Sequence, residues 1–265
     1  MPFILEKFGL VLRRFTAKLK HPINPMKQQL KLTTTLALGA LLLGASQSYA
    51  VTVTVDSSAL NLGFMNVFEL PSNGGAYVFG SSWGPSDLVS SFSGNTLTLR
   101  PNQINDPNAF WYVGGGAPGQ AGNKIMDASL YNESTGVNVG VTFMFTGNVL
   151  ANSLNGALNP YNGTTYSSVA FIKDFVGDYS SFTSTTVALN PGAFSISLLT
   201  SADPTHHIQY GFETIGSDIW ATDPALAGGA FSAIIAPTTV PEPSTLALAA
   251  MAGIASLSLF RRRSK

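Results

Sequence analysis

The acidic residues of this chain could support glycoside hydrolysis if two of them faced each other across a bound sugar. That reaction uses two carboxyl groups about 5–9.5 Å apart, one as an acid and the other as a base or nucleophile. Two pairs lie close in the sequence, Asp127 with Glu133 and Glu213 with Asp218. Only Glu213 lies within a clear alternation of apolar and polar residues, so the hydrolase remains the alternative hypothesis. Three further acids precede proline and are expected to begin turns, namely Asp106, Asp203 and Asp223.

The histidine and cysteine content argues against other kinds of reactive site. His206 and His207 are adjacent, and neighbouring residues of a strand point to opposite faces, so the two rings are not expected to share one metal ion. The chain has no cysteine, which excludes thiol nucleophiles and thiolate metal sites. It also lacks a Gly-x-Ser-x-Gly turn and a phosphate-binding loop. We therefore predict no catalytic residue, no metal and no cofactor.

Aromatic residues offer a more plausible binding surface. Trp83, Trp111, Tyr112 and Trp220 lie in or beside segments rich in glycine, asparagine and serine. Flat rings next to amides and carboxylates suit a sugar, because its apolar face stacks on the ring while its hydroxyls bond to the polar groups. The alternative is that Trp111 and Trp220 simply fill the hydrophobic core. These four residues are the candidate glycan contacts.

The charge of the chain is distributed unevenly. Lysine plus arginine and aspartate plus glutamate each number 14 over the whole chain, which gives a net charge of zero. Residues 51–239 contain three basic residues, Arg100, Lys124 and Lys173, against twelve acidic ones, a formal charge of −9. A segment this acidic offers no basic surface to a phosphate backbone, so we exclude nucleic acid as a partner.

The same segment has the sequence pattern of β-strands. Apolar and polar residues alternate over 137–145, 194–198 and 208–213, as in a strand with one buried face. Further strands are expected at 51–55, 76–81, 96–100, 109–113, 126–131, 169–175, 185–189 and 230–235, separated by Gly-, Pro- and Asn-rich turns. We predict one all-β domain over 51–239, an antiparallel β-sandwich of jelly-roll-like or lectin-like arrangement. Helix is expected only in short turns and in the two terminal segments.

The N-terminal segment has the three parts of a secretory signal peptide. Lys27 and Lys31 precede an apolar run at 32–45, and Ser48 and Ala50 provide the small residues that signal peptidase requires. We assign 1–50 as the signal peptide, with cleavage between Ala50 and Val51. The typical pattern begins at Met26, so residues 1–25 are either a long basic extension or the product of an upstream start-codon error, which we favour.

The C-terminal segment 240–265 also has three parts. Pro241, Glu242 and Pro243 are followed by an uncharged run at 244–260 and then by three arginines, Arg261, Arg262 and Arg263. The run has 17 residues, at the short end of what spans a hydrocarbon core of about 30 Å as a helix. The arginines are expected to remain cytoplasmic and to fix the orientation of a transmembrane helix at 244–260.

This arrangement resembles the tripartite PEP-CTERM sorting signal. The resemblance implies that the tail is recognised through Pro241, Glu242 and Pro243 and processed by a membrane enzyme, an exosortase, in a Gram-negative bacterium that makes exopolysaccharide. It also implies transient membrane anchoring before the protein reaches the cell surface or extracellular matrix. We therefore expect an exported, non-enzymatic protein associated with exopolysaccharide. The alternative is an exported carbohydrate-active hydrolase on a jelly-roll scaffold.

Overall fold

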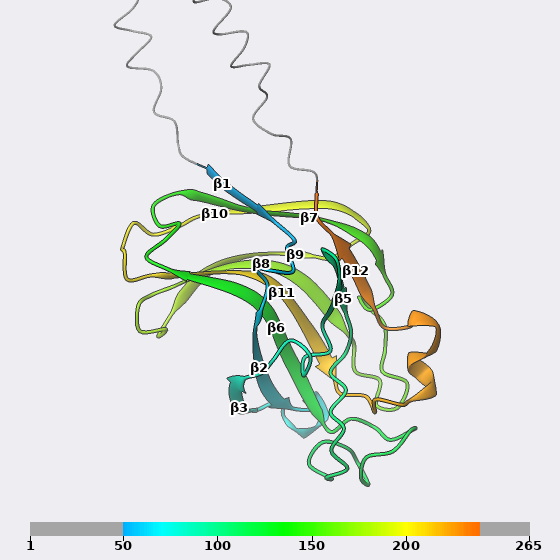
Figure 1. Ribbon diagram of the computed structural model, residues 1–265. Helices are drawn as coiled ribbons and strands as arrows, with labels where there is room; N and C mark the ends of the chain where they lie inside the picture. The colour runs from blue at the N-terminus through cyan, green and yellow to red at the C-terminus, as the bar shows by residue number, and fades with distance from the viewer. Residues whose placement is uncertain (1–49, 239–265) are drawn as a thin grey trace, which may run out of the picture. The chain divides into compact units, whose positions relative to one another are not determined.

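The computed structural model describes residues 50–238 of the 265-residue chain (Figure 1). Apart from Ala50, the expected signal peptide lies outside the described residues, as do the sorting tail 240–265 and its apolar run 244–260. Within 50–238, no helix is both long and apolar enough to cross a membrane.

Strands dominate the described part of the chain, which otherwise contains two short 3-10 helices, η2 (Pro71–Asn73) and η3 (Pro224–Gly229). The strands are β1 (Ala50–Thr54), β2 (Leu62–Glu69), β3 (Tyr77–Ser82), β4 (Ser91–Ser93), β5 (Thr96–Leu99), β6 (Lys124–Thr135), β7 (Thr142–Asn152), β8 (Ser167–Phe175), β9 (Phe182–Ala188), β10 (Gly192–Leu199), β11 (His207–Ser217) and β12 (Ala233–Ala236). This composition confirms the all-β prediction for residues 50–238.

The strands form two six-stranded sheets (Figure 1). Sheet A follows the order β1-β7-β12-β5-β4, with β10 also paired to β7. Sheet B follows the order β3-β2-β6-β11-β8-β9. Strands β1 and β7 run parallel, with Ala50 opposite Thr142, whereas the other pairs between named strands are antiparallel. The sheets are therefore rich in antiparallel pairing, as expected, with β1 as the exception.

Large aromatic side chains join the two sheets. Phe143 and Phe145 of β7 are fully buried and lie against Tyr210 of β11, with ring centroids 5.4 and 5.1 Å apart respectively. Phe145 also contacts Phe212 at 5.2 Å. These rings belong to a buried cluster that includes Leu97 and Leu99 of sheet A and Ala170 and Ile172 of sheet B. We call it the inter-sheet core, and its burial is the main force that holds the sandwich together.

A second, smaller cluster lies beneath the loops that follow β3 and β5. Its buried members are Met65, Val67, Leu88, Met126 and Ala128. Half-buried side chains from the loops pack against it, among them Trp83, Ile104 and Trp111. We call this cluster the loop core.

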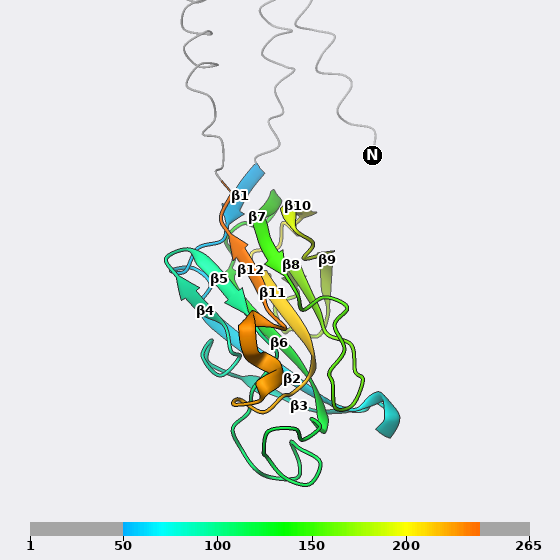
Figure 2. The ribbon, with the colours of Figure 1, turned by 90° about the vertical axis from the view of Figure 1, so that its right-hand side faces the viewer.

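The chain enters and leaves the described sandwich at one end. Strand β1 begins and β12 ends on the same side of the sandwich, whereas the long loop 100–123 protrudes from the opposite end (Figures 1 and 2). A hydrogen bond from the backbone N–H of Thr238 to the Thr54 hydroxyl oxygen, 3.0 Å long, ties the end of the described chain to β1.

The strand expected over 137–145 begins later than the alternation suggested. Gly136, Asn138 and Gly140 have φ values of 66°, 62° and 68°, in the left-handed region that glycine and asparagine tolerate best. Three such residues at alternate positions interrupt the extended backbone, so β7 starts only at Thr142. The predicted buried positions Phe143 and Phe145 are nevertheless confirmed as core.

Two other boundaries were predicted wrongly. Residues 109–113 form turns with one isolated bridge, Tyr112 to Gly122, and Trp111 packs on the loop core instead of extending a sheet. The last strand, expected over 230–235, is Ala233–Ala236, and Phe231 before it has a φ of 52°. Strands β2 and β4 were not predicted at all.

Candidate functional site

Two loops line an open pocket of about 650 Å³, to which residues from the end of β3, from loop 83–90 and from loop 100–123 contribute. Trp83 and Trp111 line it, with Asp87, Gln103 and Asp106 among the polar lining. We call it the Trp pocket. The loop core forms its support, because both indoles pack against that cluster.

Trp83 is fixed by its backbone and by its ring nitrogen. Its Nε1–H donates a 2.7 Å hydrogen bond to the Ser81 hydroxyl, and its backbone N–H donates to the Gly63 carbonyl at 3.0 Å. A β-carbon at Gly63 would overlap the Trp83 carbonyl oxygen and the Leu88 side chain. Glycine at position 63 therefore allows β2 and the Trp83 turn to lie in contact, which holds the indole at the edge of the sheet.

Trp111 stands nearly perpendicular to Trp83. The two ring centroids are 6.4 Å apart with an interplanar angle of 75°, and Phe110 packs edge-on against Trp111 at 4.6 Å. The Trp111 N–H donates to the Asn108 carbonyl at 3.0 Å, and its carbonyl accepts from the Asn123 N–H at 2.7 Å. Two indole rings at such an angle offer two apolar walls to a ligand in the pocket.

The polar groups of the pocket are only partly engaged by the protein. Asp87 is exposed, and its Oδ2 accepts the backbone N–H of Gly84 at 3.2 Å. Asp106 is also exposed, and its Oδ1 accepts the N–H of Asn108 at 2.9 Å. The buried Nε2 of Gln103 has no hydrogen-bond partner within residues 50–238. The pocket thus combines aromatic walls with carboxylate oxygens that are free to accept hydrogen bonds, a combination that suits sugars.

The four candidate aromatic residues separate into two pairs. Trp83 and Trp111 meet in the Trp pocket, whereas Tyr112 and Trp220 pack on each other outside its lining, with centroids 5.4 Å apart. Tyr112 is fully buried, and its hydroxyl donates to the Ile104 carbonyl at 2.6 Å. Burial raises the pKa of Tyr112 far above its usual value. Tyr112 therefore supports the loop beneath the pocket and presents no surface to a glycan.

The carboxyl pairs chosen from the sequence do not face each other. Asp127 and Glu133 both lie in β6, six residues or roughly 20 Å apart along the strand. Glu213 lies in β11, and Asp218 follows the end of that strand, about 17 Å away for an extended chain. Both separations exceed the roughly 9.5 Å that hydrolysis allows.

The sheet instead brings Asp127 close to Glu213. Residue Ser129 of β6 is the partner of Glu213 in β11, so Asp127 is the diagonal neighbour of Glu213 on the same face. Burial, and secondarily the charge of Glu213, raise the pKa of Asp127 to about 7. Glu213 itself pairs with Lys173 at 2.8 Å. Sequence reasoning missed this contact because it depends on which strands pair.

Asp218 is a second acid whose environment was not foreseen. It is fully buried, and neither carboxylate oxygen has a hydrogen-bond partner within the described chain. Burial raises the pKa of Asp218 to about 7; the nearby backbone N–H groups of Lys124 and Asp218, which do not reach hydrogen-bonding geometry, and the charge of Lys124 oppose this rise only weakly. Lys124 is bound to Glu69 at 3.2 Å. Asp218 is absent from the lining of the Trp pocket.

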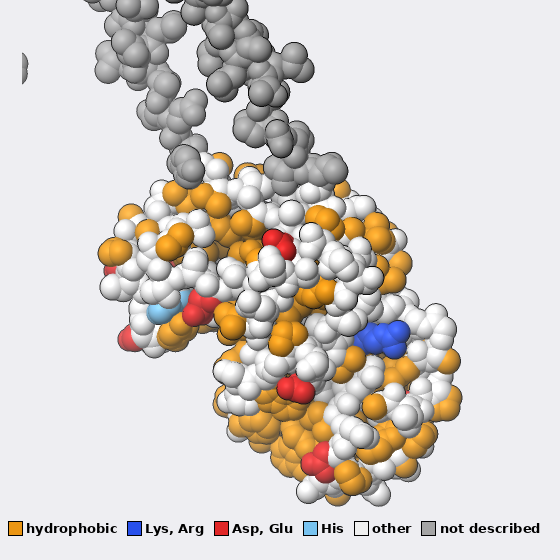
Figure 3. Space-filling view, viewed as in Figure 1, with side chains coloured by type: hydrophobic (Ala, Val, Ile, Leu, Met, Phe, Trp, Pro, Cys, Tyr) orange, Lys and Arg blue, Asp and Glu red, His pale blue; other side chains and the backbone are white. Residues whose placement is uncertain are grey.

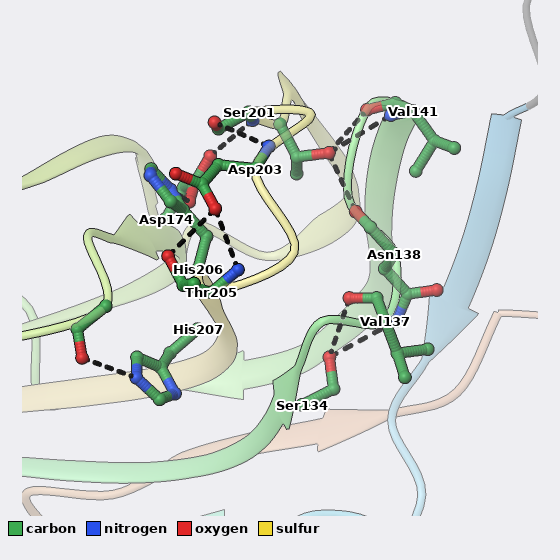
Figure 4. Close-up of polar contacts among 12 residues, drawn as sticks. Ser134, Val137, Asn138, Val141, Asp174, Ser201, Asp203, Thr205, His206 and His207 are labelled. Carbon is green, nitrogen blue, oxygen red and sulfur yellow. Dashed lines mark hydrogen bonds and ion pairs between the residues drawn. The ribbon is translucent and has the colours of Figure 1, made fainter.

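The two histidines have different partners, and only His207 lies within β11. The Nδ1 of His206 lies 2.6 Å from Oδ1 of Asp174, a buried carboxylate whose Oδ2 accepts the Ser201 N–H (Figure 4). His207 stacks on Tyr179, with centroids 4.2 Å apart, and its Nδ1 lies 2.7 Å from the Thr135 hydroxyl. Residues 50–238 contain no group of three or more histidine or acidic side chains placed to hold a metal ion.

The residues expected to mediate export lie mostly outside the described part. Ala50 and Val51 are the first two residues of β1, and Val51 pairs with Phe143. A chain that begins at Val51 would keep all but one residue of this strand. Pro241, Glu242, Pro243 and the arginines 261–263 are not described.

Comparison with known proteins identifies the tail. Residues 239–263 match a family model described as the PEP-CTERM protein-sorting motif. No curated protein and no solved structure was found to match the chain. The motif spans Pro241, Glu242, Pro243, the uncharged run and the three arginines. The chain therefore carries the PEP-CTERM sorting motif, which marks it as a protein exported and sorted by an exosortase-like enzyme.

Proposed function

We propose that this protein is a non-enzymatic component of the cell surface or extracellular matrix of a Gram-negative bacterium, where it associates with exopolysaccharide. Signal peptidase would remove residues 1–50. The tail would hold the protein in the membrane through a helix at 244–260 until the exosortase-like enzyme processes it. The mature β-sandwich would then bind polysaccharide through the Trp pocket.

The Trp pocket is the observation that carries this proposal. Its two indoles meet at 75°, and carboxylate and amide groups with free hydrogen-bonding capacity surround them. Sugars bind to such surfaces through stacking and hydroxyl hydrogen bonds together. Loop 100–123, which supplies Trp111, lies at the opposite end of the sandwich from the end of β12 (Figures 1 and 2). Attachment through the tail would thus leave this loop accessible.

The placement of the acids favours binding over hydrolysis. A glycosidase needs one carboxylic acid that burial keeps protonated near neutral pH. The acids whose pKa burial raises to about 7, Asp127 and Asp218, are absent from the lining of the Trp pocket. The two carboxylates that line the pocket, Asp87 and Asp106, are both exposed. A pocket of this kind is suited to holding a glycan without cleaving it.

Retention in the matrix tests the binding role. Cells would express the wild-type chain or a Trp83→Ala, Trp111→Ala variant, and the fraction of protein that sediments with washed exopolysaccharide would be measured. We expect most of the wild type in the matrix and most of the variant in the medium. Tyr179→Ala is the control, since it removes an exposed aromatic ring that is absent from the pocket lining. Equal retention of all three proteins would refute binding through the pocket.

Sorting requires a separate experiment on the tail. Replacing Pro241, Glu242 and Pro243 with alanine should leave the protein in the membrane and unprocessed, because the apolar run and the arginines remain. Deleting residues 244–265 should release the protein without sorting. Fractionation and mass determination of the recovered chain distinguish these states. Normal maturation of the alanine variant would mean that the three residues serve only as a linker.

A further inference from the structure

We infer that the Trp pocket selects a sugar that carries a protonated amino group, in preference to neutral and acidic sugars. This inference rests on the proposed glycan-binding function and specifies the ligand class for the same site. It follows from the charge of the lining and from the arrangement of the two indoles.

The pocket contains negative charge that no protein cation neutralises. Asp87 and Asp106 line it, and the lining includes no lysine or arginine. Each carboxylate uses one oxygen to accept a backbone N–H, which leaves its other oxygen free of any hydrogen bond within residues 50–238. Lys124 is paired with Glu69 and Lys173 with Glu213. Arg100, at the start of loop 100–123, is absent from the pocket lining. A ligand cation would therefore supply the missing charge.

Hydrogen bonds connect each carboxylate to the turn that carries a tryptophan. Asp87 accepts from Gly84, the residue that follows Trp83. Asp106 accepts from Asn108, whose carbonyl in turn accepts the Trp111 N–H at 3.0 Å. The negative groups and the indoles thus belong to the same two hydrogen-bonded turns, and all four side chains line one pocket.

The indoles strengthen the preference for a cation. An ammonium group over an indole face is attracted by the ring quadrupole, and a nearby carboxylate adds to this attraction. The 75° angle between Trp83 and Trp111 allows one ring to stack on the sugar while the other faces its amino group. Asn105, an exposed residue that also lines the pocket, offers its side-chain amide to the sugar hydroxyls.

An acidic sugar would meet the opposite conditions. Its carboxylate would lie near Asp87 and Asp106, and removing two like charges from water at close range is unfavourable. The surrounding surface gives no compensation, since residues 51–239 carry a formal charge of −9. Lysine and arginine occupy only one patch of the face seen in Figure 3, against several scattered acids. A neutral N-acetylated sugar should bind with intermediate affinity.

Calorimetric titration with three short oligosaccharides tests the inference. The full chain, purified in detergent, would be titrated with oligomers of glucosamine, N-acetylglucosamine and galacturonic acid of equal length. We expect glucosamine oligomers to bind at least about tenfold more tightly than the acetylated ones, a difference of about 1.4 kcal/mol. Added salt should weaken the binding of glucosamine oligomers and leave that of the acetylated ones almost unchanged.

Variants in which a carboxylate is replaced by an amide show which residues cause the preference for amino sugars. Asp87→Asn and Asp106→Asn should each reduce the affinity for glucosamine oligomers several-fold without changing the affinity for the acetylated ones. Asp178→Asn removes the same charge from an exposed residue of another loop and should change neither affinity. An equal loss in the Asp178 variant would mean that only the net charge of the protein attracts the amine, and the inference would fail.

The outcomes also separate this inference from the proposed function. Equal affinity of the amino and acetylated oligomers, both lost in Trp83→Ala, would overturn the amine preference and leave the glycan-binding pocket standing. Tightest binding of galacturonic acid oligomers would overturn the preference in the same way. Failure of the wild type to bind any oligomer or purified exopolysaccharide would overturn both proposals.

Discussion

The inter-sheet core is built mainly from strand residues at every second position, whereas the loop core combines strand residues with side chains that reach in from loops. Phe143, Phe145 and Phe212 are fully buried in the first cluster. In the second, Trp83 and Trp111 remain half-buried and expose part of each ring to the Trp pocket. Aromatic rings thus provide stability in one region and, in our account, binding in the other.

This difference has a consequence for mutation. A substitution in the inter-sheet core disturbs both sheets at once, because its rings contact partners across the sandwich. A substitution at the pocket surface removes ring area that is already partly solvated. Stability and binding should therefore respond to different residues.

The largest expected effect is that of Phe143→Asp. It places a charge where the native ring is fully buried, 5.4 Å from Tyr210, and should lower the free energy of unfolding by at least about 4 kcal/mol. Thr142→Asp, one residue earlier and half-exposed, should cost less than about 1 kcal/mol. Urea denaturation of both variants measures this contrast, and equal losses would show that we have assigned the wrong face of β7.

The second effect is a dependence of stability on pH. The pKa of Asp218 is about 7 in the folded protein, above its usual value near 3.9, so the folded state binds more protons than the unfolded state between these values. Stability should therefore fall as pH rises from about 4 to about 7, by up to roughly 4 kcal/mol for this group. Asp127 acts in the same direction.

Asp218→Asn should flatten this fall, because the buried group can no longer ionise. Asp178→Asn is the control. Hydrogen bonds from Ser180 lower the pKa of Asp178, so this group makes stability rise with pH, and removing it cannot reduce the loss of stability between pH 4 and pH 7. Denaturation midpoints measured between pH 4 and pH 8 provide the comparison. An Asp218→Asn curve parallel to that of the wild type would contradict a buried, uncompensated carboxyl group.

A smaller effect on stability than those of Phe143→Asp and Asp218 is expected for Trp83→Phe. The phenyl ring keeps most of the packing on Leu88 and loses the 2.7 Å hydrogen bond to Ser81, so the loss should be about 1 kcal/mol. Its glycan affinity should nevertheless fall several-fold. Phe145→Leu should behave in the opposite way. It should lose more stability than Trp83→Phe, but at temperatures where it remains folded it should bind the glycan as tightly as the wild type. If the loss of glycan affinity in both variants simply followed the loss of stability, the claim that the inter-sheet core provides stability and the Trp pocket provides binding would be wrong.

The sequence predicted the inter-sheet core because burial there follows the period of a strand. Phe194 and Ile196 of β10, and Tyr210 and Phe212 of β11, were all expected to share a buried face and do so. Strand β2 escaped prediction because Phe64 and Phe68 place apolar residues on the face opposite Met65 and Val67, which hides the alternation.

The Trp pocket could be predicted only in part. The residue types of Trp83 and Trp111 indicated sugar contacts, but their meeting depends on Gly63 and on the packing of loop 100–123 against the loop core. The contact between Asp127 and Glu213 depends on the pairing of β6 with β11, which residue spacing within one strand does not specify. Local patterns thus predict which face of a strand is buried. A site formed by several elements can be predicted only when the pairing and register of its strands are known.

The most direct test of a glycan-binding pocket is a titration of the purified full chain with exopolysaccharide from the producing cells. Affinity would be measured for the wild type and for the Trp83→Ala, Trp111→Ala variant, with circular dichroism to verify that both are folded. Our account predicts saturable binding by the wild type and at least about a tenfold loss in the variant. Undiminished binding by the folded variant would contradict it.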